Sequence, residues 1–124
     1  MNVLLDTSVW IRGLSGQQPY AQGLGKLLAR RAVRGHALVY GELLIGDRGG
    51  RAGLLRDFER MHQAPTVAHG EVVTLVRRRA LHGRGIGWVD AHLLASALAA
   101  GLELWTADLA LATIAEGFGI NHRP

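Results

Sequence analysis

The chain has 124 residues, a length that suits one domain without a linker, so residues 1–124 are predicted to form a single unit. Hydrophobic residues make up 48% and charged residues 19%, a balance typical of a globular rather than a disordered protein. The formal net charge of +4 comes from 14 basic residues, of which only Lys26 is a lysine. An arginine-rich surface suits an anionic partner such as nucleic acid, although it can also simply keep a small apolar domain in solution.

The first predicted element is a strand over residues 1–5, which are apolar except for Asn2. Consecutive apolar residues favour a central parallel strand that is buried on both faces. Asp6 then follows its carboxyl end, the edge at which open α/β sheets hold their ligands. The alternative is that Asp6 or Thr7 caps a helix that begins near Ser8.

A helix is predicted over residues 20–34 after a loop at 13–19, and Gly35 ends it. The second strand must then be very short, because residues 37–45 favour a third helix. In that helix Leu38, Glu42 and Ile45 are spaced by four and three, which predicts an apolar face that includes Glu42. An inward carboxylate is costly unless it pairs with an arginine or binds a metal ion, and both alternatives stay open.

A fourth helix is predicted over residues 51–62, followed by a short strand over 64–66. A fifth helix begins near Glu71, where the helix dipole favours an acid in the first turn. Three arginines, 77–79, come late in that helix. Successive helical positions lie about 100° apart, so the three cannot all face one ligand.

The segment from 87 to 111 predicts a buried helix, a strand and another helix. Only His92 and Ser96 are polar between residues 91 and 100, so most sides of that helix must be covered. A strand over 102–105 and a helix over 109–116 complete a unit that suits a parallel sheet, and residues 118–120 are predicted as a final edge strand. Asp90 and Asp108 begin the two helices, beside the ligand-holding edge of the sheet.

Several familiar sites are excluded, because the dinucleotide, P-loop, zinc-protease and nucleophile-elbow motifs are missing and there is no cysteine. His92 is more typical of a packed histidine than of a ligand. What remains is a set of acids that like-charge repulsion would keep apart unless a hard cation such as Mg²⁺ or Mn²⁺ held them. Such an ion activates water and stabilises charge on a phosphodiester. The candidate metal ligands are Asp6, Glu42, Asp90 and Asp108.

Four blocks of sequence carry a family resemblance: V-L-L-D-T-S-V-W-I, G-E-L-L-I-G, G-W-V-D-A-H-L-L-A-S-A-L and L-W-T-A-D-L-A-L. In order and spacing they resemble the signature blocks of PIN-domain ribonucleases, specifically the VapC toxins of toxin-antitoxin pairs. The resemblance implies an α/β PIN fold, with a short parallel sheet of four to five strands flanked by helices.

The same resemblance implies Mg²⁺- or Mn²⁺-dependent endonucleolytic cleavage of RNA, a VapB-like antitoxin partner and a tendency to form homodimers. By position, Asp6, Glu42, Asp90 and Asp108 match the acidic residues of the family. Thr106 matches its hydroxyl residue, which would orient the last acid or a metal-bound water.

A second hypothesis is a PIN-like module that grips RNA or a protein without cutting. A phospho-accepting receiver domain fits poorly, because it resembles a family that relies on a late lysine and the sole lysine here is Lys26. The three tryptophans, Trp10, Trp88 and Trp105, are predicted to pack in the core rather than stack on bases. No apolar run approaches the roughly 20 residues of a membrane span, and Asp6 interrupts the first apolar segment, so a cytoplasmic protein is expected.

Overall fold

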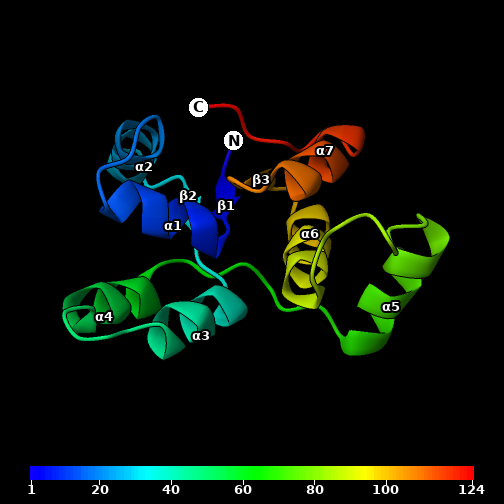
Figure 1. The fold of residues 1–124 in the computed structure, drawn as a ribbon, viewed down its shortest axis with the longest axis horizontal. Helices are drawn as coiled ribbons and strands as arrows, with labels where there is room; N and C mark the ends of the chain where they lie inside the picture. The colour runs from blue at the N-terminus through cyan, green and yellow to red at the C-terminus, as the bar shows by residue number, and fades with distance from the viewer.

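The computed structural model describes all residues, 1–124, and contains three strands and seven helices (Figure 1). In chain order the elements are β1 (Val3–Leu5), α1 (Thr7–Leu14), α2 (Tyr20–Ala29), β2 (Val33–Arg34), α3 (Ala37–Ile45), α4 (Ala52–Arg60), α5 (His69–Arg78), α6 (Trp88–Ala100), β3 (Glu103–Trp105) and α7 (Leu109–Gly117). Every helix falls short of the length and apolar content that a bilayer crossing requires.

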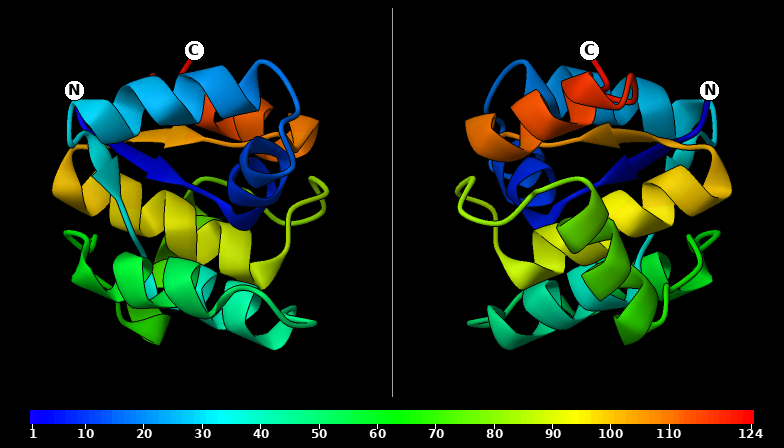
Figure 2. Two further views of the ribbon diagram at one scale, coloured as in Figure 1. Left: turned by 90° about the vertical axis from the view of Figure 1, so that its left-hand side faces the viewer. Right: turned by 90° about the vertical axis from the view of Figure 1, so that its right-hand side faces the viewer.

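The sheet is parallel, with the strand order β2-β1-β3, and β1 is fully buried at its centre. Figure 2 shows α2 and α7 on one face and α6 on the other, with α3 and α4 farther out on the α6 side. This is the predicted α/β architecture, but with three strands rather than four to five. The predicted strands at 64–66 and 118–120 are absent, because each edge gains only a one-residue bridge, at Gln63 and at Asn121.

The second helix and second strand differ from the prediction. Helix α2 ends at Ala29, because Arg31 adopts a positive φ of 54° and turns the chain back toward the sheet. The N–H of Ala32 donates to the carbonyl of Leu27, and Val33 then pairs with Val3. Strand β2 therefore precedes Gly35 instead of following it, and a helix that continued to residue 34 would leave β1 without this neighbour.

The buried helix α6 was predicted correctly, and Gly101 ends it in the left-handed conformation, with φ of 66°. Its one buried polar side chain, Ser96, lies against His36, which is also fully buried. The Nδ1 atom of His36 accepts from the N–H of Leu38 at 3.0 Å, so Nε2 carries the proton and donates to Ser96 Oγ at 2.9 Å. Burial lowers the pKa of His36 and keeps this ring neutral while it caps α3.

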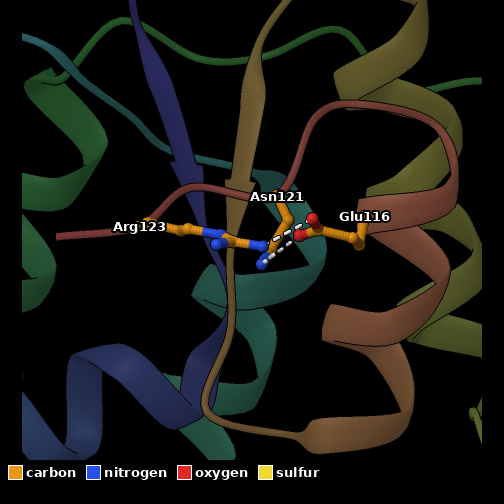
Figure 3. Close-up of polar contacts among 3 residues, drawn as sticks. All are labelled: Glu116, Asn121 and Arg123. Carbon is orange, nitrogen blue, oxygen red and sulfur yellow. Dashed lines mark hydrogen bonds and ion pairs between the residues drawn. The ribbon is translucent and has the colours of Figure 1, made fainter.

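The C-terminal segment is tied to α7 by polar contacts (Figure 3). The Glu116 carboxylate accepts from Arg123 Nη2 at 2.5 Å and from Asn121 Nδ2 at 3.3 Å. The ring of His122 lies 5.2 Å from that of Trp105, which also stacks on Tyr20 of α2. The last residues thus cover β3 and α2.

Two glycines of α2 provide a matched test of this packing. A Cβ on Gly23 would lie 2.6 Å from the ring of the buried Trp105, whereas one on Gly25 would meet nothing within 4 Å. We expect Gly23→Ala to lower the free energy of unfolding by about 1–3 kcal/mol through overpacking. Gly25→Ala should raise it by up to about 1 kcal/mol, because alanine is the better helix former. Urea denaturation of both variants checks this, and equal effects would contradict the close packing of α2 on β3.

Candidate active site

Asp6 lies buried where β1 ends, and it is anchored by three donors. Its Oδ1 accepts from Ser8 Oγ at 2.5 Å and from the N–H of Val9 at 3.2 Å, while Thr106 Oγ1 donates to Oδ2. The residue therefore caps α1 and also lies at the carboxyl edge of the sheet, so the helix cap does not exclude the predicted position. Burial raises the pKa of Asp6, and the donated hydrogen bonds partly offset that effect.

Two hydroxyls join the ends of β1 and β3. Thr106 Oγ1, besides donating to Asp6, accepts from the N–H of Asp108 at 3.0 Å, and Ser8 Oγ accepts from the N–H of Ala107 at 3.0 Å. Asp108 Oδ1 in turn accepts from the N–H of Leu111 at 3.2 Å and caps α7. Thr106 thus contacts the side chain of Asp6 and the backbone of Asp108. Ser8 was not singled out from the sequence, although it is the last residue of the D-T-S triplet that Asp6 begins.

Asp90 stands at the start of α6, half-buried, with its Oδ2 accepting from the N–H of Gly87 at 3.0 Å. Burial raises the pKa of Asp90, and the negative charges of Asp6, Asp108 and Glu42 raise it further. All four predicted acids therefore lie close enough for the charges of the other three to affect Asp90. In the left view of Figure 2 the carboxyl end of β1 and the first turns of α6 and α7 lie at the same, right-hand end of the molecule.

Glu42 is not inward, contrary to the prediction. The buried residues of α3 are Val39 and Leu43, whereas Glu42 is exposed and Ile45 is 89% exposed. Helix α3 is apolar around most of its circumference, so residue spacing alone could not tell which side faces the core. Glu42 is nevertheless held near the site, because Thr7 Oγ1 donates to its Oε1 at 2.5 Å.

The four acids offer the oxygen ligands that a divalent cation prefers, but they are not preformed as a metal site. No three acidic or histidine side chains lie close enough together to hold a metal ion. None of the four forms an ion pair; the two pairs in the structure are His122–Glu103 and Arg123–Glu116. Glu42, Asp90 and Asp108 each accept a single hydrogen bond, which leaves one carboxylate oxygen without a protein donor. Uncompensated carboxylates suit a hard divalent cation, and ligation would require these side chains to turn toward one another.

Comparison with known proteins identifies the family, because the model described as PIN domain matches residues 3–117. The chain belongs to the PIN-domain family. Ribonuclease VapC32 of Mycobacterium tuberculosis, from strains CDC 1551 / Oshkosh and ATCC 25618 / H37Rv, is 44% identical to this PIN-domain chain over 107 residues, 86% of the chain and 84% of the relative. This places the chain among the VapC ribonucleases, as the sequence blocks predicted. The crystal structure of PAE2754 from Pyrobaculum aerophilum shares the fold, with a TM-score of 0.57, 18% identity and coverage of 91% of this chain and 84% of that one.

The like charges of this PIN-domain site predict a stability effect at Asp90. The pKa of Asp90 is raised on folding, so as the pH rises the Asp90 carboxyl ionises first in the unfolded chain, near about pH 3.9. The free energy of unfolding therefore falls as the pH rises from that value through the pKa of Asp90 in the folded chain. Asp90→Asn keeps an oxygen for the Gly87 N–H and removes the charge. In metal-free buffer we expect the variant to melt above the wild type at pH 7 and to match it below about pH 4.

The control is Asp57→Asn, because Asp57 is exposed on α4 and makes no side-chain hydrogen bond or ion pair. Its melting temperature should follow the wild type at every pH. A lower melting temperature for Asp90→Asn at pH 7 would contradict the repulsion among the four acids.

Proposed function

We propose that this PIN-domain protein is a Mg²⁺- or Mn²⁺-dependent endoribonuclease toxin of the VapBC type, a hydrolase that cuts RNA phosphodiesters at the end of the sheet where Asp6, Asp90, Asp108 and Glu42 gather. The observation that carries the proposal is that four carboxylates, none of which has a basic ion-pair partner, lie near one another at this end of the sheet. Burial raises the pKa of Asp90, and the charges of the other three acids raise it further. The relative in Mycobacterium tuberculosis, which is named a ribonuclease, supports the same activity.

The residues of the chain have distinct roles in this proposal. Asp6, Asp90, Asp108 and Glu42 hold the cation, which, when bound, activates water for attack and stabilises charge on the phosphodiester. Thr106 is a positioning residue, because it donates to the Asp6 carboxylate and accepts from the backbone of Asp108. Two more hydroxyls, on Ser8 and Thr7, fix Asp6 and Glu42 by hydrogen bonds.

The proposal includes protein partners, a VapB-like antitoxin and a second copy of the chain, and action on RNA in the cytoplasm. Apolar side chains left in solvent on two helices that pack together, α1 and α3, support a partner. They are Ile11, Leu14, Leu44 and Ile45, between 45% and 89% exposed.

A second candidate is a PIN-like module that binds RNA or a protein without cutting it. It is favoured by one observation: no three candidate ligands lie close enough to hold an ion as the side chains stand. Such a module would keep the basic surface, with a formal net charge of +4, and the acids would then serve mainly as helix caps.

One experiment separates the two candidates. Purified protein is incubated with structured RNAs and Mg²⁺, and the products are examined by primer extension and by native gel. We expect cuts at defined positions that vanish when EDTA is present. A shift in mobility with intact RNA would favour the binding module and contradict the proposed enzyme.

A further inference from the structure

Trp88 differs from the other two tryptophans, because it is not part of the core as predicted. Trp10 and Trp105 are each 2% exposed, whereas Trp88, at the first position of α6, is 45% exposed. Its ring is held from two helices: His69 of α5 lies 5.2 Å away between ring centroids and His92, one turn along α6, lies 5.1 Å away. An indole in solvent with its orientation fixed by neighbours is a preformed surface for another flat ring.

Beside Trp88 the surface is hollowed. The ring and Gly87 line an open cavity of about 110 Å³ whose other walls include Val76, Leu81 and Ile86. The loop that closes it contains Gly83, with φ of 71°, so part of the wall has no side chain. The result is a small, mostly apolar recess with an aromatic wall, between α5 and the first turn of α6.

This recess adjoins the acidic site at Gly87. Gly87, which lines the recess, also donates its N–H to Asp90 Oδ2 at 3.0 Å. Trp88 and Asp90 are two helical positions apart and so project about 200° apart around α6. The carboxylate and the indole therefore lie on opposite sides of the first turn of α6, and a strand that contacts both must cross the N-terminal end of this helix.

The charge around the recess suits a nucleic-acid strand better than an apolar peptide. Arg79 and Arg84 lie exposed on the segment that joins α5 to α6, and neither forms an ion pair. Arg84 also lines the neighbouring hollow with Leu109 and Ala110, at the start of α7 directly after Asp108. Arg79 and Arg84 also line one shared hollow beside Phe118, so their guanidinium groups can contact phosphates of a strand that lies along this segment.

We propose that Trp88 stacks on an unpaired base of the RNA, next to the phosphodiester that lies at the acids, and thereby selects single-stranded substrate. The inference rests on the proposed function for the position of the cut, but the stacking itself needs no cleavage. Stacking of a base on an aromatic side chain tolerates many sequences and requires an unpaired nucleotide.

The test compares Trp88→Ala and Trp88→Phe with Leu28→Ala, which truncates an equally exposed side chain, 43%, on α2. Binding to a single-stranded RNA oligonucleotide is measured in EDTA, where nothing is cut. We expect the dissociation constant to rise about tenfold for Trp88→Ala and to change little for Trp88→Phe and Leu28→Ala. RNA should quench wild-type tryptophan emission, and this quenching should be lost in Trp88→Phe, since the two remaining tryptophans are buried.

A series of oligonucleotides with one abasic site each, moved along the strand, supplies a readout that a purely structural role would not change. One abasic position should weaken binding by the wild type and leave Trp88→Ala unaffected. In cleavage assays Trp88→Ala should raise KM with kcat nearly unchanged. Equal binding by Trp88→Ala and Leu28→Ala would overturn the stacking inference and leave the ribonuclease proposal in place. Base-dependent quenching without any cleavage would support stacking and contradict the ribonuclease proposal.

Discussion

Asp6→Asn should reduce RNA cleavage at least about a hundredfold and leave the fold intact. The carboxylate lies where β1 ends and is one of the four proposed ligands, so its charge contributes several kcal/mol to the transition state through the cation. The amide oxygen of asparagine can still accept from Ser8 and Val9, which keeps the cap of α1. Since burial raises the pKa of Asp6, a neutral side chain should also leave the free energy of unfolding unchanged or increase it.

The measurements are initial rates of RNA cleavage and the urea midpoint of each variant. Asp57→Asn, the same change at an exposed position of α4, is the matched control and should retain wild-type rates. Cleavage by Asp6→Asn at more than a tenth of the wild-type rate would exclude a role for this carboxylate. An unfolded variant would be replaced by Asp108→Asn, which lies on the surface at the start of α7.

Removal of divalent cations should abolish cleavage, and their return should restore it and stabilise the fold. A cation that binds only the folded chain raises the free energy of unfolding by about 2.7 kcal/mol at a hundred times its dissociation constant. Part of that gain comes from relief of the like-charge repulsion that, in addition to burial, raises the pKa of Asp90. The measurements are cleavage after EDTA treatment and melting temperature in a titration with Mg²⁺ or Mn²⁺.

The control for the stabilising effect is Asp90→Asn, which lacks one proposed ligand. Its melting temperature should respond more weakly to the cation than that of the wild type. Undiminished cleavage in excess EDTA would rule out a metal-dependent mechanism, and an equal thermal response by both proteins would show that the cation binds elsewhere.

The sequence predicted the central part of the fold well because its signals there are local. The apolar run before Asp6, the apolar helix before Gly101 and the strand that ends at Trp105 each appear in the structure. Asp90 and Asp108 begin their helices as predicted, since an acid near a helix start satisfies free backbone N–H groups whatever else it does. Three of the acids, Asp6, Asp90 and Asp108, could therefore be assigned to the same end of the sheet from topology.

The errors arose where the outcome depends on neighbours that are distant in sequence. The end of α2 is set by a turn at Arg31 that brings Val33 to β1, and no helix-breaking residue marks it. The side of α3 that meets the core is set by α1 and α4, so Glu42 was placed on the wrong face. Trp88 is apolar and was assigned to the core, but the ends of α5 and α6 leave it in solvent.

The hydrogen bond between Thr106 and Asp6 joins residues that are 100 positions apart in the chain. Ribosomes add about 5–20 residues per second, so roughly 5–20 seconds separate the synthesis of these two side chains. During that interval the nascent polypeptide has Asp6 but neither β3 nor Asp108, and the first strand has no neighbour on that edge. The acidic centre is consequently one of the last parts of the molecule to form during translation, and a prematurely terminated product would lack it altogether.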